Sequence, residues 1–197
     1  MSGTIFECGY GAIVNEDVQV LEACLSELCE QKGIIHVLEI GMHAGATARG
    51  IKAFAEARGC QIWYIGIDPD TSGRCVAWDG ATVLIGDSAE LFHKVPNGLD
   101  LVWVDGCHCM NHVILDLIHY APKVRPQGFM CFHDINPEGA GQFHQYHGPD
   151  IPEFGLGTLQ AFEALRWPWD PWVEFLRKWP EDKADCGTVA FRKGEPA

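Results

Sequence analysis

The sequence lacks a long hydrophobic run and is poor in basic residues. No uninterrupted apolar stretch in its 197 residues approaches the roughly 18 that a membrane-spanning helix needs. Lysine and arginine number 14 against 27 aspartates and glutamates, which gives a formal net charge of -13. An acidic surface repels phosphate groups, so we expect neither a nucleic acid nor a membrane as the main partner. Residues 1–10 lack the basic and apolar regions of a secretory signal, and we expect a cytoplasmic protein.

The chain also lacks any pair of cysteines with C-x-x-C spacing, although it has nine cysteines. An odd number, scattered through apolar segments, indicates neither a zinc ribbon nor a thioredoxin-like site. We therefore expect reduced thiols that serve as small apolar residues in the cytosol. What the chain does have is 47% hydrophobic residues over a length typical of one domain, which is enough for a packed core.

Short apolar strands alternate with amphipathic helices along most of the chain. Because each strand is apolar throughout, the pattern predicts a parallel sheet covered by helices on both faces. The predicted strands span residues 34–40, 62–67, 82–85, 101–104, 129–132, 172–176 and 188–191. One helix is predicted after Asn15, and three more are predicted at 47–58, 88–94 and 157–165. A further helix is predicted between the fourth and fifth strands, with a buried stripe of Val113, Ile114, Leu117 and Ile118. A turn is predicted at 125–128, and a long loop at 138–157.

The turn after the first predicted strand suits a ligand. Gly41 and Gly45 stand four residues apart between a strand and a helix, where glycine lets the backbone approach a bound group. A dinucleotide fingerprint would need glycine at position 43, which is histidine, and at position 46, which is alanine. Nicotinamide binding is therefore disfavoured, and steric needs alone also explain two glycines in such a turn.

Acidic residues end the next two predicted strands. Asp68 ends the second, where a carboxylate can accept both hydroxyls of a ribose; a plain turn aspartate before Pro69 is the alternative. Asp87 follows the third, where it can accept a hydrogen bond from an adenine amino group. It can also cap the helix that begins at Ser88, and the two roles are compatible.

The order of these motifs resembles the cofactor-binding series of class I S-adenosylmethionine-dependent methyltransferases over residues 34–192. The resemblance implies a Rossmann-like, doubly wound α/β fold with a seven-stranded sheet, mainly parallel with the last strand antiparallel. It implies a single domain with an N-terminal helical segment (1–33), a cofactor-binding core (34–136) and a substrate loop, helix and two final strands (137–197). The residues implied at the cofactor are Glu39, Gly41, His43, Gly45, Thr47, Asp68, Asp87, Ser88 and Asp105.

A second group of residues is similar to one branch of that class, the small-molecule O-methyltransferases that include macrocin O-methyltransferase-like and cephalosporin-hydroxylase-like proteins. The resemblance rests on Val104–His108, Asp116, the turn 126–128 and the pair His133–Asp134. Several members use a divalent metal. The implied reaction is methyl transfer to a hydroxyl of a small molecule, and a homo-oligomer is an open possibility. The branch usually has an aspartate where this chain has Cys107, which puts the role of that position in doubt.

Asp105 and Asp134 end two strands that the predicted topology places side by side, so both carboxylates should face the crevice above the sheet. We expect Asp105, His133 and Asp134 to bind a metal, with Mg²⁺ favoured by the oxygen ligands. Asp105, His108 and His133 are the candidate catalytic residues, because either histidine can take the proton of the acceptor hydroxyl. The alternative is that Asp105 and His108 only hydrogen-bond to the cofactor and the loop backbone.

Two rival functions remain. His108, His133 and one carboxylate could form the two-histidine, one-carboxylate face of an iron oxygenase. The chain could also bind the cofactor without turnover, as a sensor or an assembly subunit, which Cys107 supports. Weaker candidates are a lid at Tyr10–Gly11, loop histidines at 144 and 147, and tryptophans at 167, 169, 172 and 179 that either stack on a ring or pack the last strands. His108 and His112 have zinc-peptidase spacing without the glutamate, and Asp116 is expected only to cap or pair.

Overall fold

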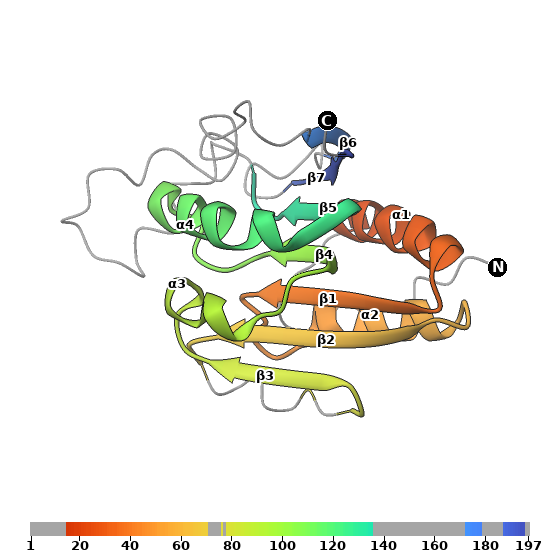
Figure 1. The fold of residues 1–197 in the computed structure, drawn as a ribbon, viewed down its shortest axis with the longest axis horizontal. Coiled ribbons are helices and arrows are strands. Elements are labelled where there is room, and N and C mark those ends of the chain that lie inside the picture. Colours follow the sequence, from red (N-terminus) through yellow and green to blue (C-terminus); the bar gives the residue numbers. More distant parts are fainter. Residues whose placement is uncertain (1–14, 71–75, 77, 136–171, 179–186, 196–197) are drawn as a thin grey trace.

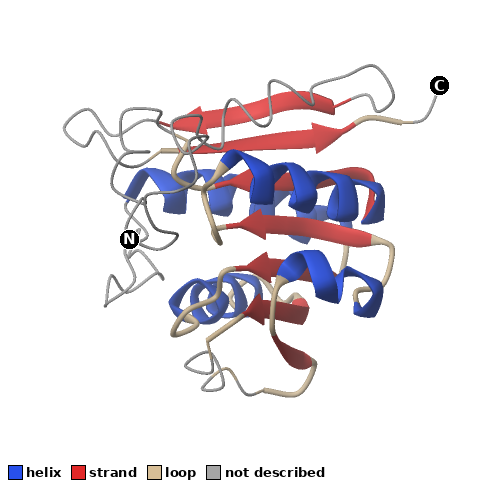
Figure 2. Ribbon diagram, turned by 90° about the vertical axis from the view of Figure 1, so that its left-hand side faces the viewer, coloured by secondary structure: helices blue, strands red, loops and turns tan. Residues whose placement is uncertain are grey.

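The computed structural model describes residues 15–70, 76, 78–135, 172–178 and 187–195. Seven strands form one sheet, with helices on its faces (Figures 1 and 2). The strands are β1 (Ile34–Ile40), β2 (Gln61–Asp68), β3 (Ala81–Ile85), β4 (Leu99–Val104), β5 (Val124–Phe132), β6 (Trp172–Lys178) and β7 (Thr188–Lys193). The helices are α1 (Asn15–Gln31), α2 (Ala46–Glu56), α3 (Ser88–Leu91) and α4 (Met110–Tyr120), with 3-10 turns η2 (Phe92–Lys94) and η3 (Ala121–Lys123).

The strand order is β3-β2-β1-β4-β5-β7-β6. Strands β1 to β5 run parallel, whereas β7 is antiparallel to both β5 and β6. The chain runs outward from β1 through β2 to β3 and then returns to place β4 on the other side of β1 (Figure 1). The seven-stranded, mainly parallel sheet with its last strand antiparallel is therefore confirmed. Such a reversal of strand order opens a crevice at the carboxyl ends of the two central strands.

Each face of the sheet has its own hydrophobic core. On one face, α1 and α2 pack their apolar stripes against side chains such as Tyr64 and Trp103. On the other face, α3 and α4 pack against residues such as Val102 and Phe132. The inward positions Ile51, Phe54 and Ala55 of α2 are all buried, as their helical spacing predicts. This double covering explains why the central strands are apolar on both sides.

The structure differs from the sequence expectations at two places. Ile118, predicted as part of the buried stripe of α4, is 55% exposed, because the buried face of this helix carries Val113, Asp116, Leu117 and Tyr120 instead. The predicted turn at 125–128 lies inside β5, which begins at Val124 and pairs with β4 through a shift in register between Leu99 and Leu101. This irregularity places Gln127 at a φ of 64°, in the left-handed region.

The described cysteines, at positions 24, 29, 60, 107, 109 and 131, are free thiols, and Cys24 and Cys131 are buried as apolar residues. No helix in the described part of the chain is long and apolar enough to cross a membrane. The predicted helix 157–165, the loop 138–157, the lid at 10–11, the histidines at 144 and 147 and the tryptophans at 167, 169 and 179 lie outside the described residues. Trp172 is partly buried and packs against the core on the α3 and α4 face of the sheet, which agrees with the prediction that it packs the last strands.

Candidate functional site

The turn after β1 comes unusually close to the turn after β4. The Asp105 amide donates to the Ile40 carbonyl at 2.8 Å, and the Gly41 amide donates to the Ile67 carbonyl at 2.8 Å. Gly41 has a φ of +82°, and a Cβ placed on it would lie 2.1 Å from the Asp105 carbonyl oxygen. Only glycine fits this position, because both the conformation and the contact exclude a side chain. The predicted glycine turn therefore forms the floor of the crevice.

A pocket of about 530 Å³ opens above this floor, a size typical of sites for small molecules. It lies at the carboxyl ends of β1, β2, β3 and β4, where their connecting turns converge. The residues that line it are Ile40, Gly41, His43, Ile67, Asp68, Pro69, Gly86, Asp87, Ser88, Asp105, Gly106, Cys107, His108, Cys109, His112 and Asp116. Six of the nine residues that the resemblance implies at the cofactor are among them: Gly41, His43, Asp68, Asp87, Ser88 and Asp105.

Asp68 holds the first turn in shape from the end of β2. Its Oδ2 accepts a hydrogen bond from the His43 amide at 2.7 Å, and its Oδ1 accepts one from the Asp70 amide at 2.7 Å. His43 adopts a φ of 41°, in the region where the dinucleotide fingerprint would carry glycine. The carboxylate thus stabilises a left-handed residue in the turn while it lines the pocket.

Asp87 and Ser88 connect the end of β3 to the pocket. Asp87 caps α3, since its carboxylate accepts a hydrogen bond from the Ala89 amide at 2.8 Å. The Ser88 hydroxyl donates to Asp116 on α4 at 2.6 Å, so the expected pairing of Asp116 is confirmed. Burial raises the pKa of Asp116 to about 7, against the effect of the Ser88 hydrogen bond. The wall between α3 and α4 therefore carries a carboxyl that titrates near neutral pH.

Three predicted cofactor residues lie outside the pocket lining. Glu39 is buried below the turn, where its carboxyl accepts a hydrogen bond from the Tyr64 hydroxyl at 2.5 Å and pairs with Thr47. Burial raises the pKa of Glu39 to about 8, and the hydrogen bonds from Tyr64 and Thr47 oppose that rise. Gly45 has a φ of +71° and packs against Val76, whose Cγ2 would lie 2.1 Å from an added Cβ. Their positions suit residues that support the turn from behind.

The predicted catalytic and metal-binding residues form one cluster at the ends of β4 and β5. Oxygen or nitrogen atoms of Asp105, His108, His133 and Asp134 all lie within 4.8 Å of one another. The Nε2 atom of His108 lies 3.5 Å from Asp105 Oδ1, and its Nδ1 atom lies 3.5 Å from Asp134 Oδ2. His133 Nδ1 lies 2.9 Å from Asp105 Oδ1 and 3.3 Å from Asp134 Oδ1. Asp134 has a φ of 51°, in the left-handed region.

Charge pairing dominates the electrostatics of this cluster. Burial alone would favour the neutral acid, but the His133 and His108 imidazoles hold the pKa of Asp105 well below its usual range. Burial likewise opposes the charged imidazole of His133, but the surrounding carboxylates of Asp105, Asp134 and Asp17 raise its pKa well above the usual range. The carboxylates around His133 therefore favour a protonated ring, and a metal bound at its Nδ1 would displace that proton.

Two residues that position His133, Asp17 and Thr188, were not among the candidates predicted from the sequence. Asp17, on α1, is fully buried, and its Oδ2 lies 2.9 Å from His133 Nε2. The hydroxyl of Thr188, at the start of β7, donates to Asp17 Oδ1 at 2.5 Å. A signal was present in the sequence, because Asp17 is an acid beside Val18 at the start of the apolar stripe of α1. A charged residue in a buried stripe needs a partner in the core.

The cluster fits a divalent cation by its donor atoms. The buried Nδ1 of His133 has no hydrogen bond of good geometry, although two carboxylates surround it. Its Nε2 is directed at Asp17, and a histidine whose second nitrogen meets a carboxylate has the orientation of a metal ligand. Two carboxylates suit Mg²⁺, and an imidazole nitrogen adds affinity for Mn²⁺ or Fe²⁺.

Similar folds occur among solved structures. An O-methyltransferase from Bacillus cereus, solved with S-adenosylhomocysteine, matches with a TM-score of 0.62 and 15% identity, covering 94% of this chain and 84% of that chain. TomG from Streptomyces achromogenes is involved in tomaymycin synthesis and was solved with S-adenosylmethionine. It matches with a TM-score of 0.64 and 14% identity, covering 93% of this chain and 82% of that chain.

The methyltransferase MycE of the mycinamycin pathway was solved with Mg, S-adenosylhomocysteine and mycinamycin VI. It gives a TM-score of 0.57 and 21% identity, covering 81% of this chain and 44% of that longer chain. No curated protein matches the sequence. At these identities the likeness shows the fold alone.

The family itself comes from the sequence match. Residues 38–135, about half of the chain, match the model of a methyltransferase domain family. This segment begins in β1 and ends just after β5, so it contains the glycine turn, the acidic strand ends and the cluster around His133. By this match and by its fold, the chain belongs to the class I S-adenosylmethionine-dependent methyltransferases.

Proposed function

We propose that the protein transfers a methyl group from S-adenosylmethionine to a hydroxyl of a small molecule, with the help of a divalent metal. One observation carries this proposal: Asp68, Asp87 and Asp105 lie at the carboxyl ends of β2, β3 and β4, on both sides of β1, and line one pocket at the point where the strand order reverses. Open α/β sheets bind their ligands in such a crevice. The small-molecule acceptor is further supported by the mycinamycin bound to MycE and by the role of TomG in tomaymycin synthesis.

We infer how the pocket holds the cofactor from its lining. Asp68 accepts hydrogen bonds from the ribose hydroxyls and Asp87 accepts one from the adenine amino group, while each keeps its backbone partner. Gly41 allows the cofactor to lie against the backbone. Glu39, Thr47 and Gly45 act indirectly, since they shape the turn from its buried side.

We assign the acceptor chemistry to the cluster at β4 and β5. His108 lines the pocket between two carboxylates and is the group that accepts the proton of the acceptor hydroxyl. His133 does not line the pocket, and its ring is fixed by Asp17, so it positions Asp105 and Asp134 and contributes to metal binding. A divalent cation bound by Asp105, His133 and Asp134 would lower the pKa of the acceptor hydroxyl. Methyl transfer is an in-line displacement, so alignment of donor and acceptor provides much of the rate.

Calorimetric titration with S-adenosylhomocysteine tests the cofactor site. The wild-type protein is expected to bind one molecule per chain, and Asp68→Ala is expected to weaken binding by about tenfold or more, which corresponds to about 1.4 kcal/mol. Asp70→Ala is a matched control, because Asp70 is exposed and donates to Asp68 through its backbone amide, which the substitution keeps. Absence of binding by a folded wild-type sample contradicts the proposal.

A second candidate rests on the same cluster. His108 and His133 with one carboxylate form the donor set of a non-haem iron oxygenase. Elemental analysis and spectroscopy of the purified protein separate the two functions: tightly bound Fe²⁺ with imidazole ligands favours the oxygenase, and exchangeable Mg²⁺ favours methyl transfer. Turnover with a panel of small hydroxyl compounds separates both enzymes from a protein that only binds the cofactor.

A further inference from the structure

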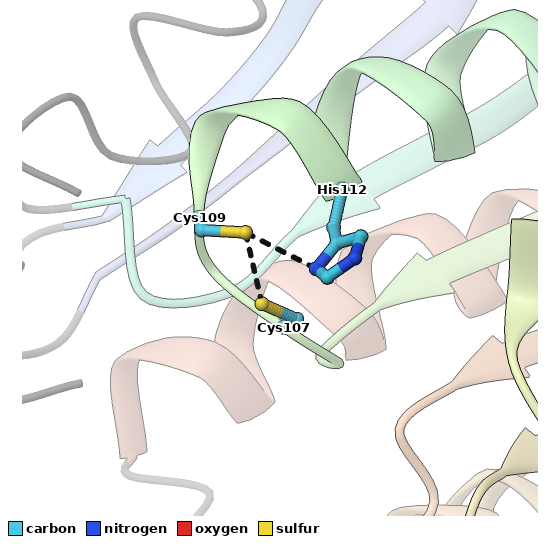
Figure 3. Close-up of side chains that lie close together, drawn as sticks. All are labelled: Cys107, Cys109 and His112. Carbon is cyan, nitrogen blue, oxygen red and sulfur yellow. Dashed lines mark hydrogen bonds between the residues drawn. The ribbon is translucent and has the colours of Figure 1, made fainter. Parts of the chain in front are cut away.

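A second cluster of ligand-type side chains lies beside the first, in the loop after β4 and the first turns of α4. Cys107 Sγ donates to Cys109 Sγ at 3.1 Å, and Cys109 Sγ lies 3.1 Å from His112 Nδ1 (Figure 3). One ligand atom from each residue lies within 4.8 Å of the others. All three residues line the pocket and are half-buried. Two sulfurs and a nitrogen therefore converge in the wall of the site.

The loop sorts its side chains into two sets of different chemistry. Asp105 and His108 face the cluster at β5, whereas Cys107, Cys109 and His112 gather on their own. Thiolate ligands select metals such as Zn²⁺, whereas carboxylates suit Mg²⁺. The two sets can therefore bind different metals within one pocket.

The geometry of the second set suits Zn²⁺. Zinc–sulfur bonds of about 2.3 Å in a tetrahedron separate two sulfur ligands by about 3.8 Å. The sulfurs of Cys107 and Cys109 lie closer than this, so a bound ion requires them to move apart by about 0.7 Å, which rotation of the two side chains can supply. Cys109 is the N-cap residue of α4, so its sulfur lies at the electropositive end of an 11-residue helix, which favours the thiolate form that binds a metal.

The charge around the set also favours a cation. Asp116 lines the pocket next to it and interacts electrostatically with both Cys109 and His112. Asp116 is held in place by the Ser88 hydroxyl at 2.6 Å. Catalytic zinc sites have three protein ligands and a fourth position open to a pocket. Zinc sites that only stabilise a fold have four protein ligands and no open position.

We propose that Cys107, Cys109 and His112 bind Zn²⁺, with the fourth coordination position open to the pocket for water or for a thiol or hydroxyl of a bound molecule. Binding forms two zinc–sulfur bonds and one zinc–nitrogen bond and releases the two thiol protons to solvent. This site uses none of the residues assigned above to the cofactor or to the metal at Asp105, so it stands independently of the methyl-transfer proposal.

Titration of the reduced, metal-free full-length protein with Co²⁺ tests the site, because Co²⁺ replaces Zn²⁺ and reports its ligands by absorption. One equivalent of Co²⁺ is expected to give a thiolate-to-cobalt charge-transfer band and the strong visible bands of tetrahedral Co²⁺, and Zn²⁺ is expected to abolish both. Cys107→Ser, Cys109→Ser and His112→Asn are each expected to weaken binding by at least about 100-fold, because the outer partners of a metal site alone contribute about 10- to 100-fold.

Two controls separate this site from the rest of the molecule. Asp134→Asn is expected to keep the charge-transfer band, because it alters only the oxygen-rich cluster. Cys29→Ser, on α1, is expected to keep it as well. Circular dichroism identifies any variant that fails to fold, and the remaining two ligand variants then decide the outcome.

Three results would overturn the proposal. The first is that a sample whose thiols titrate as free binds no cobalt. The second is that cobalt binds without the charge-transfer band, and the third is that the band persists in the folded double variant Cys107→Ser/Cys109→Ser. A loss of S-adenosylhomocysteine binding in the separate calorimetric experiment would bear only on the proposed function.

Discussion

At the scale of single residues, Glu39 shows how burial changes the chemistry of an acid. Its carboxyl lies under the glycine turn with 1% exposure, and the loss of hydration raises its pKa to about 8. The unfolded chain releases this proton near pH 4.5, so between those values the folded state holds a proton that the unfolded state lacks. The free energy of unfolding must therefore fall as the pH rises across this window.

Glu39→Gln keeps the shape of the side chain and an acceptor for Tyr64 but removes the titration. Between pH 5 and pH 8 we expect the wild type to lose up to about 1.4 kcal/mol of unfolding free energy per pH unit relative to this variant. Urea unfolding at several pH values measures the difference. Glu30→Gln, on the exposed side of α1, is the control and should follow the wild type. If the unfolding free energies of Glu39→Gln and the wild type changed with pH in parallel, Glu39 would be ionised in the folded protein.

Gln127, a residue with a side chain, adopts a backbone conformation that favours glycine. Its φ of 64° puts a side chain in the left-handed region, which costs about 1–2 kcal/mol for residues other than glycine. We expect Gln127→Gly to raise the free energy of unfolding by about 0.5–1 kcal/mol, because the relief of strain exceeds the added entropy of the unfolded chain. Thermal unfolding measures this gain. Gln61→Gly, in the extended strand β2, is the opposite control and should lower stability.

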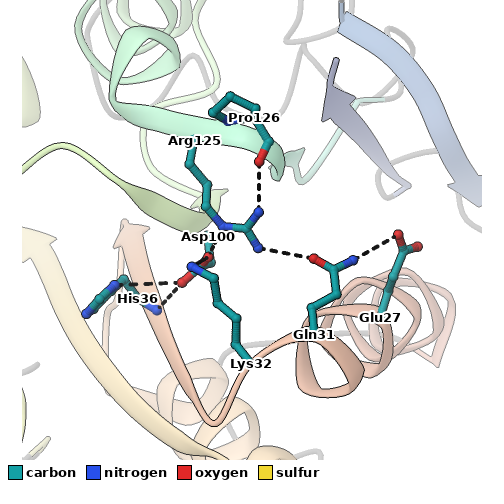
Figure 4. A network of polar contacts seen from close by, with 7 residues as sticks. All are labelled: Glu27, Gln31, Lys32, His36, Asp100, Arg125 and Pro126. Atoms are coloured by element: carbon teal, nitrogen blue, oxygen red, sulfur yellow. Dashed lines mark hydrogen bonds and ion pairs between the residues drawn. The ribbon is translucent and has the colours of Figure 1, made fainter. Parts of the chain in front are cut away.

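At the scale of elements, one buried carboxylate joins four segments at the end of the sheet away from the pocket. Asp100 in β4 is fully buried, accepts hydrogen bonds from the Lys32 ammonium at 2.7 Å and the His36 amide at 2.8 Å, and pairs with Arg125 of β5 (Figure 4). Burial alone would raise the pKa of Asp100, but the hydrogen bonds from His36, Lys32 and Arg125 hold it below the usual range. Its stabilising effect is therefore present at neutral pH and is lost as the pH falls through the lowered pKa.

We expect Asp100→Ala to lower the free energy of unfolding at pH 7 by about 3 kcal/mol, because it removes one partner of a buried ion pair and leaves the His36 amide without an acceptor. Lys32→Ala is the matched control and should cost less than about 1 kcal/mol, since the Lys32 side chain is 36% exposed and Arg125 still neutralises the carboxylate. Chemical denaturation gives both values. Equal losses in the two variants would mean that the contact with Lys32 dominates the network.

At the scale of the whole molecule, the pocket joins parts of the fold that are distant in sequence. Its lining comes from the ends of four strands and from α4, so the proposed cofactor would contact both sides of the reversal between β1 and β4. A ligand that binds only the folded state stabilises the whole chain, and the gain in unfolding free energy grows with the logarithm of the free ligand concentration once the site is saturated. The single-domain division into 1–33, 34–136 and 137–197 and the homo-oligomer both stay predictions.

S-adenosylhomocysteine at 100 times its dissociation constant is therefore expected to raise the free energy of unfolding by about 2.7 kcal/mol. For a chain of this size the melting temperature should rise by roughly 5–11 °C. Differential scanning calorimetry with and without the ligand measures the shift, and adenosine alone should give a smaller one because it lacks the amino acid part. An unchanged melting temperature at saturation would contradict binding in the pocket.

The sequence by itself determined the order of strands and helices, the parallel core of the sheet and the placement of acids at the strand ends. These features are local: the apolar pattern of 34–40 gives β1 with the same bounds, Gly41 occupies a turn that glycine favours, and Asp68 ends β2 as its place after the apolar run predicts. Parallel strands carry their carboxyl ends to one edge, so Asp68, Asp87 and Asp105 had to lie on the same side of the sheet.

Only the tertiary structure decided which side chains meet. Asp17 and Thr188 are 171 residues apart, and their contact behind His133 depends on the packing of α1 against the last strands. The same holds for Asp100 and Lys32, and for Glu39, whose strand register turns it away from the pocket. Pattern and propensity act between neighbours in sequence, whereas burial, charge pairing and pKa shifts arise from groups that folding brings together.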